Sequence, residues 1–170
     1  MNVFYLDRCP YRAAVMCCDQ HVRKMILESC QMLVTARVMA GELPAGTRYT
    51  TLRMKNHPCA VWVREGGLGW LERHMLGLCA EYEYRFSGVA HATYRFYFEE
   101  VGALFAPVAV GLAQPLCVSV ERDEGDAVGT YRRYYVQEKA RFASWTRRAP
   151  PRWFTEGLAD AGRAHTGETR

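Results

Sequence analysis

The chain has 170 residues, of which 49% are hydrophobic and 24% are charged, and its formal net charge is +4. This balance is typical of globular proteins and excludes collagen-like, low-complexity and intrinsically disordered chains. The length favours one domain with a substantial core, and a net charge this small indicates a charged partner only if it is concentrated in one region.

The first predicted helices follow from residues that suit helix starts. Pro10 suits the first turn of a short helix over residues 10–18, and Asp19 suits the N-cap of a longer helix over residues 20–40. Apolar residues recur in the longer helix at i, i+3 and i+4 spacing, so one side should pack on the core. A polar ridge is predicted on its other side, formed by His21, Lys24, Glu28, Gln31 and Thr35.

The middle of the chain predicts a loop followed by a bent helix. Residues 41–56 are rich in turn formers and should form an exposed connection. Asn56 or His57 followed by Pro58 suits the start of the next helix. The glycines between residues 66 and 69 should break or bend that helix before it resumes over residues 69–86.

Further helices are expected over residues 93–104 and 127–145, with buried irregular chain over residues 106–118 between them. Residues 155–170 lack core-forming positions and should be a flexible tail. The sequence therefore predicts an all-α fold. It should be a single compact helical domain over residues 1–154, with about four to five helices, an aromatic and basic C-terminal helix, and the tail.

Membrane spans, disulfides and metals are not expected. No segment approaches the run of about 18 uncharged apolar residues that a membrane span needs. Asp7 and two arginines also interrupt the start of the chain, where a signal peptide would be apolar, so we expect a cytoplasmic protein. The 7 cysteines include no C-x-x-C pair, which fits neither a disulfide framework nor a zinc site. They are expected to be reduced and mostly buried, and no metal or cofactor is predicted.

The polar ridge is the first candidate site. A histidine, an ammonium group, a carboxylate and an amide on one helix face could support acid/base chemistry or bind phosphate. The same pattern is typical of a solvated helix face, on which Lys24 and Glu28 would form an i, i+4 pair. His57 could donate to a phosphate at the start of its helix or only cap that helix.

The charge excess is local to residues 131–152. Seven basic residues and one acidic residue give this segment a net charge of +6, against +4 for the whole chain. Aromatic residues alternate with the cations, a combination that nucleic-acid surfaces use to bind bases and phosphates. The aromatic residues also suit the core stripe of an amphipathic helix whose exposed side carries the arginines, and we expect both to hold. The DNA contacts predicted in and beside this segment are Arg132, Arg133, Arg141, Arg147, Arg148 and Trp153.

Three short motifs occur in an order that is known from one enzyme family. They are D-Q-H-x6-E over residues 19–28, N-H-P over residues 56–58 and E-Y-E-Y-R-F over residues 81–86. With these motifs the chain resembles, over roughly residues 1–88, the phage and microbial pyrimidine-dimer DNA glycosylases of the endonuclease V type. The resemblance implies that Glu28 is the catalytic glutamate and that base and backbone contacts come from Asp19, Gln20 and His21.

The resemblance also implies a mechanism. An enzyme of this family kinks duplex DNA, a base leaves the stack, and an amine attacks the sugar C1′ to form an imine. The family's amine is the N-terminus, on a small second residue that is exposed when the initial methionine is removed. Here Asn2 should leave Met1 in place, so the amine would be that of Met1, with Lys24 as the substitute amine on the polar ridge.

The predicted function is a phage-type enzyme that acts on a pyrimidine nucleotide of double-stranded DNA, most simply a DNA glycosylase with or without AP-lyase activity. One alternative is a transferase that hypermodifies thymine or cytosine on the same scaffold, and another is a non-catalytic DNA-binding protein. A monomer is assumed. The predicted catalytic residues are Glu28, Met1, Lys24 and His21, and further DNA contacts are predicted at Gln20, Gln31 and His57.

Overall fold

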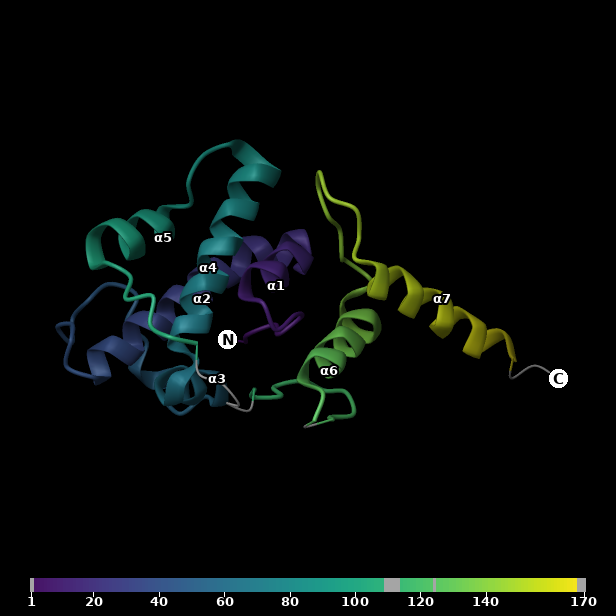
Figure 1. Cartoon of the computed structure of the whole chain (residues 1–170), viewed down its shortest axis with the longest axis horizontal. Coiled ribbons are helices and arrows are strands. Elements are labelled where there is room, and N and C mark those ends of the chain that lie inside the picture. The colour runs from purple at the N-terminus through teal and green to yellow at the C-terminus, as the bar shows by residue number, and fades with distance from the viewer. Residues whose placement is uncertain (1, 109–113, 124, 168–170) are drawn as a thin grey trace.

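The computed structural model describes residues 2–108, 114–123 and 125–167. Over these ranges the regular elements are all helical and no strand occurs, so the predicted all-α class is confirmed. Figure 1 shows the N-terminal segment between helices α1 to α5 on one side and α6 and α7 on the other, with α7 projecting outward. In this segment Val3, Phe4 and Leu6 are buried.

Helices α1 (Pro10–Met16) and α2 (Asp19–Met39) lie close to the predicted ranges. Pro10 stands in the first turn of α1, where its missing N–H leaves no donor unsatisfied. The prediction that Asp19 caps α2 is wrong, because Cys18 is the N-cap and Asp19 is the first helical residue. The Asp19 carboxylate accepts hydrogen bonds from Thr146 and not from its own helix.

The predicted loop over residues 41–56 holds one short 3-10 turn, Leu52–Met54, and leads to α3 (Pro58–Trp62). His57 caps α3, since its Nδ1 accepts a hydrogen bond of 3.2 Å from the backbone N–H of Cys59. A π-helical turn, Val63–Gly67, joins α3 to α4 (Leu68–Tyr82), and Gly66 within it has a φ of +136°. Only glycine adopts this backbone geometry without strain, so the predicted bend is confirmed.

The second half of the chain has shorter helices than the sequence predicted. Helix α4 continues as the π-helical turn Glu83–Ser87, and α5 (Ala92–Tyr94) continues as Arg95–Val101. Helix α6 (Ala127–Tyr134) continues to Lys139 and no further, because loop and turns follow it up to α7 (Arg152–Gly167). The expected start of the tail, residue 155, falls inside α7.

The core forms where α1 and α2 pack against α4. Leu6, Ile26, Leu33 and Leu71 have no exposed side-chain surface. Helices α1 and α4 approach closely at Gly77, where a Cβ would lie 2.8 Å from the Cβ of Ala14. Tyr131 of α6 and Tyr135 beyond it are also fully buried, so α6 contributes to the same core.

Two expectations about composition can be compared with this fold. In the described part of the chain, no helix combines the length and apolar character needed to cross a membrane. The seven cysteines all lie in that part, and they are free thiols. Five of them are buried, as predicted, and the two that are half-buried are Cys9 and Cys117.

Candidate active site

The beginning of the chain lies against Glu28. The backbone nitrogen of Asn2 is 3.1 Å from Oε2 of Glu28, and Nζ of Lys24 is 3.5 Å from Oε1. The Glu28 side chain is 14% exposed, whereas that of Lys24 is 62% exposed. Met1, with its predicted amine, lies outside the described residues. Residue 2 lies directly at the predicted catalytic carboxylate.

Contacts from distant parts of the chain fix the Asn2 side chain. Its Nδ2 donates to the carbonyl oxygen of Cys117 at 3.0 Å. Its Oδ1 accepts from the backbone N–H of Val3 at 2.8 Å and from the hydroxyl of Tyr131 at 3.3 Å. Because both ends of the amide are held, the position of residue 2 beside Glu28 is determined by the fold.

A histidine and two thiols border this position. One ligand atom each from His57, Cys59 and Cys117 lie within 4.8 Å of one another, and Cys59 Sγ is also 3.7 Å from Oδ1 of Asn2. Burial lowers the pKa of His57, so the imidazole is neutral at pH 7. Burial and the neighbouring Cys117 raise the pKa of the Cys59 thiol. Cys59, Cys117 and Tyr131 were not predicted as site residues.

The prediction that His21 and Thr35 lie on an exposed polar ridge is wrong, because both residues are buried. The His21 ring stacks on Phe4, with centroids 4.0 Å apart, and its Nδ1 is 2.5 Å from the hydroxyl of Tyr135. Burial lowers the pKa of His21 to about 3. A neutral imidazole enclosed in this way supports the N-terminal segment through packing.

Other ridge residues are accessible. Gln20 and Lys24 are exposed and line a surface hollow together with Arg23 and Phe142. Gln31 is half-buried, one turn of α2 beyond Glu28. The ridge therefore divides into a buried part and an accessible part. In the buried part His21 contacts Tyr135 and Thr35 contacts Thr51, and the accessible residues lie on α2 on both sides of Glu28.

Asp19, which the resemblance assigns to DNA contacts, lies in a buried ion network. Arg85 donates to Asp19 at 3.2 Å and to Glu81 at 2.9 Å, and the backbone N–H of Thr146 donates to Asp19 at 2.9 Å. Burial by itself would raise the pKa of Asp19, but hydrogen bonds from Thr146, Arg85 and Ser144 outweigh burial and lower it. Asp19 therefore joins the start of α2 to the C-terminal part of the chain.

The residues of the basic segment have different surroundings. Arg148 pairs with Glu81, Arg147 donates to the carbonyl of Tyr84, and Arg132 donates to the carbonyl of Leu6. Arg133 and Arg141 are exposed, the latter with its guanidinium over the Phe142 ring.

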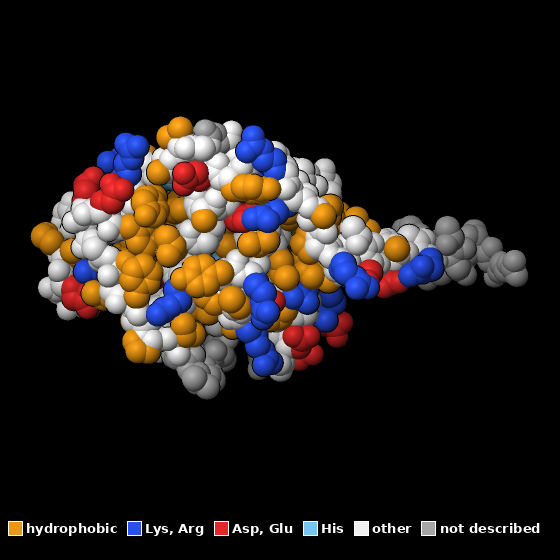
Figure 2. Space-filling view, turned by 45° about the horizontal axis from the view of Figure 1, so that its top comes forward, with side chains coloured by type: hydrophobic (Ala, Val, Ile, Leu, Met, Phe, Trp, Pro, Cys, Tyr) orange, Lys and Arg blue, Asp and Glu red, His pale blue; other side chains and the backbone are white. Residues whose placement is uncertain are grey.

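Trp153, also predicted to contact DNA, is half-buried, and the guanidinium of Arg132 lies 5.5 Å from its ring centre. Figure 2 shows Lys and Arg side chains beside hydrophobic surface near the end of the molecule from which α7 projects. The segment thus combines arginines that hold the fold together with cations that are open to a ligand.

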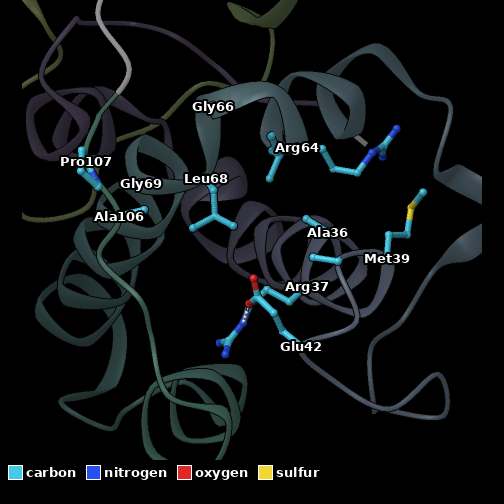
Figure 3. A pocket seen from close by; sticks show the side chains of 12 residues that line it. Ala36, Arg37, Met39, Glu42, Arg64, Gly66, Leu68, Gly69, Ala106 and Pro107 are labelled. Atoms are coloured by element: carbon cyan, nitrogen blue, oxygen red, sulfur yellow. Dashed lines mark hydrogen bonds and ion pairs between the residues drawn. The ribbon is translucent and has the colours of Figure 1, made fainter.

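A second hollow lies at the other end of α2. It is lined by Arg37 and Glu42 and, on the facing side, by Leu68, Ala106 and Pro107 (Figure 3). Arg37 Nε is 3.0 Å from Oε2 of Glu42, so the acidic group is already paired. The lining includes no hydroxyl, thiol or imidazole group, and the hollow was not predicted as a site.

Comparison with known proteins gave one family. The family of pyrimidine dimer DNA glycosylases matches residues 1–95, more than half of the chain, and the matched range holds Asn2, Glu28 and His57. Neither the curated proteins nor the solved structures contain a significant match. The matched range includes the N-terminal segment and the carboxylate that the fold brings together, and the chain belongs to the pyrimidine dimer DNA glycosylase family.

Proposed function

We propose that this protein removes a pyrimidine base from double-stranded DNA through an amine held at Glu28. The hydrogen bond of 3.1 Å that the backbone N–H of Asn2 donates to Oε2 of Glu28 carries this proposal, because it holds the residue that follows Met1 at this carboxylate. The neutral amine forms a bond to C1′ while the bond from C1′ to the base breaks and the base takes the electron pair. Glu28 then takes one proton from the attached amine and passes it to O4′ as the bond between C1′ and O4′ breaks, which opens the sugar ring and leaves a protonated imine at C1′. Solvent water protonates the departed base.

We infer that the amine is the N-terminal one. An α-amino group has an ordinary pKa near 8, so an appreciable fraction is neutral at pH 7, whereas a lysine amine has a pKa near 10.4. Lys24 is largely exposed and lies beside the other oxygen of Glu28.

DNA is expected to reach Glu28 across the accessible part of the ridge and the exposed cations. We propose Gln20, Gln31, His57, Arg133 and Arg141 as the contacts with the nucleic acid, and the location of the substrate would place the enzyme in the cytoplasm. Four arginines of this segment already bind protein atoms, so their part in DNA binding would require additional contacts from the same guanidinium groups; they are Arg132, Arg133, Arg147 and Arg148.

Borohydride trapping tests the proposal, because reduction converts an imine into a stable covalent adduct. Ultraviolet-irradiated, uracil-containing and abasic duplexes are incubated with the protein, and intact mass defines whether its first residue is Met1 or Asn2. We expect an adduct that an added N-terminal extension abolishes and that Lys24→Ala retains, with Lys55→Ala as a surface-lysine control.

The other outcomes identify the alternatives. Loss of the adduct in Lys24→Ala, with the extended protein still active, would assign the amine to the lysine. No adduct on any duplex would contradict the imine mechanism. An intact strand with added mass would then indicate base modification, and unchanged DNA would indicate a binding protein.

A further inference from the structure

His57, Cys59 and Cys117 form a cluster of potential metal ligands beside Asn2. Their ligand atoms lie within 4.8 Å of one another. His57 and Cys59 come from the start of α3, whereas Cys117 comes from irregular chain 58 residues further on. The fold, and not a local sequence motif, brings these donors together.

The distance between the sulfur atoms fits a shared ion. Cys59 Sγ and Cys117 Sγ are 3.7 Å apart. Two thiolates bound to one tetrahedral Zn²⁺, each at about 2.3 Å from the metal, would be separated by about 3.8 Å. A disulfide would need a separation of about 2.05 Å, so the two sulfur atoms would have to move closer together.

The donor types also fit a thiophilic divalent ion. Two cysteines and one histidine form a common three-residue ligand set for zinc, and such a set leaves the fourth position to solvent. Asn2 Oδ1 is close, but it already accepts from Val3 and Tyr131, and this occupies both of its lone pairs. The long capping hydrogen bond to His57 Nδ1, 3.2 Å, can be exchanged for a bond to the metal.

We propose that His57, Cys59 and Cys117 bind one Zn²⁺ ion, with water in the fourth position. The ion ties the start of α3 to the 114–118 segment. Because the carbonyl of Cys117 accepts a hydrogen bond from the Asn2 side chain, this tie also fixes residue 2 beside Glu28. The metal acts here as a positioning element for the N-terminal segment.

Metal binding by the whole, reduced protein tests the proposal without DNA, so the result does not depend on whether the glycosylase proposal holds. Protein freed of metal with a chelator is dialysed against Zn²⁺ and analysed for bound metal, and a parallel sample is titrated with Co²⁺. We expect one ion per chain and, with Co²⁺, thiolate-to-metal charge-transfer bands together with the visible bands of a tetrahedral ion. Removing a ligand should lower the affinity by at least about 10–100-fold, the loss found when groups that merely support a ligand are removed.

The variants for this test are Cys59→Ser and Cys117→Ser, with Cys9→Ser as the matched control. Cys9 is half-buried before α1, where serine is a favoured cap, so its replacement should leave the metal in place. Circular dichroism checks that each variant is folded. If Cys59→Ser fails to fold, Cys117→Ser provides the test, because Cys117 lies in irregular chain.

Three results of the metal analysis would overturn the proposal. They are a wild-type protein that retains no stoichiometric metal, equal metal content in the folded ligand variants, and Co²⁺ spectra without thiolate bands. A disulfide between Cys59 and Cys117 would also overturn it. In protein purified without reductant, this bond would appear as an intact mass lower by two hydrogens and as a pair of peptides linked through these two cysteines.

Discussion

Arg148 binds Glu81 through two nitrogen atoms, with Nη2 2.6 Å from Oε1 and Nε 3.1 Å from Oε2. The same carboxylate accepts from Arg85, whose guanidinium is fully buried. Glu81 thus joins two arginines, one inside the fold and one at its surface.

Arg148 and Arg141 both belong to the basic segment, but we expect them to have different roles, which two substitutions can distinguish. Arg148→Ala should lower the free energy of unfolding by about 1–2 kcal/mol, because it removes charged hydrogen bonds to a buried carboxylate that keeps one other partner. Arg141→Ala should leave stability nearly unchanged and should lower the slope of log affinity for duplex DNA against log salt by about 0.9. Denaturant unfolding and binding titrations at several salt concentrations measure both effects. An unchanged salt slope for Arg141→Ala would remove this residue from the DNA interface.

The Glu28→Gln variant tests the role of the carboxylate. We expect it to abolish imine formation and base release while the protein stays folded, because the amide keeps the shape and an oxygen acceptor for Asn2 but cannot receive the proton. Loss of the half-exposed pair with Lys24 should lower stability by at most about 1 kcal/mol. Trapping assays and thermal melts are compared with Glu138→Gln, an exposed isosteric control. Retained activity in a protein that melts several degrees lower would make Glu28 a structural residue.

Tyr131 tests whether the position of residue 2 matters. Its hydroxyl lies 2.5 Å from the carbonyl oxygen of Pro115 and 3.3 Å from Oδ1 of Asn2, and its side chain is fully buried. We expect Tyr131→Phe to lower the free energy of unfolding by about 1–2 kcal/mol, through the lost hydrogen bonds. It should also slow imine formation under conditions in which the variant is fully folded. Tyr11→Phe, at an exposed position, is the control, and an unchanged trapping rate would show that the hydroxyl only stabilises the fold.

We expect the folded protein to lose stability in mild acid because of the buried side chain of His74. Its ring is buried against Trp70 and its Nδ1 lies 3.0 Å from the carbonyl oxygen of Pro10; burial lowers its pKa to about 4 although this hydrogen bond opposes the shift. Below the ordinary pKa of about 6.5, the unfolded chain takes up a proton that the folded chain does not. The free energy of unfolding should therefore fall, as the pH drops from about 6.5 to 4, by up to about 1.4 kcal/mol per unit for this residue.

His74→Gln should reduce that dependence, since glutamine can donate to Pro10 but does not titrate in this range. Denaturant unfolding at a series of pH values gives the slopes. His91→Gln is the comparison, because His91 is only half-buried and should contribute less. Equal slopes for the wild type and His74→Gln would contradict this account.

Local signals predicted much of the fold. Pro10, the His57-Pro58 pair and the glycines after residue 65 each act within a few residues, and the helices begin or bend near them. Long-range packing decided the rest. The spacing of α2 placed His21 on its polar face, but Phe4 and Tyr135, the latter 114 residues away, cover that position.

The candidate site was predictable in part for the same reason. Glu28 and His57 stand in short motifs, and Cys59 directly follows one of them. Cys117 has no such signal, because it lies in irregular chain and reaches Cys59 only through tertiary structure. The difference between an arginine that binds a phosphate and one that binds Glu81 is likewise invisible in a run of basic residues.

The hydrogen bonds between Thr146 and Asp19 join the C-terminal part of the chain to the region that matches the family. The family match ends at residue 95, yet Thr146 binds Asp19, Arg132 binds the carbonyl of Leu6, and Trp145 binds that of Met16. A fragment cut after residue 95 would lose all three contacts and leave the surface around Phe4 open to water. We therefore expect that the family region does not fold as a separable module, and that substitutions in the C-terminal half affect the half that holds Glu28 through folding.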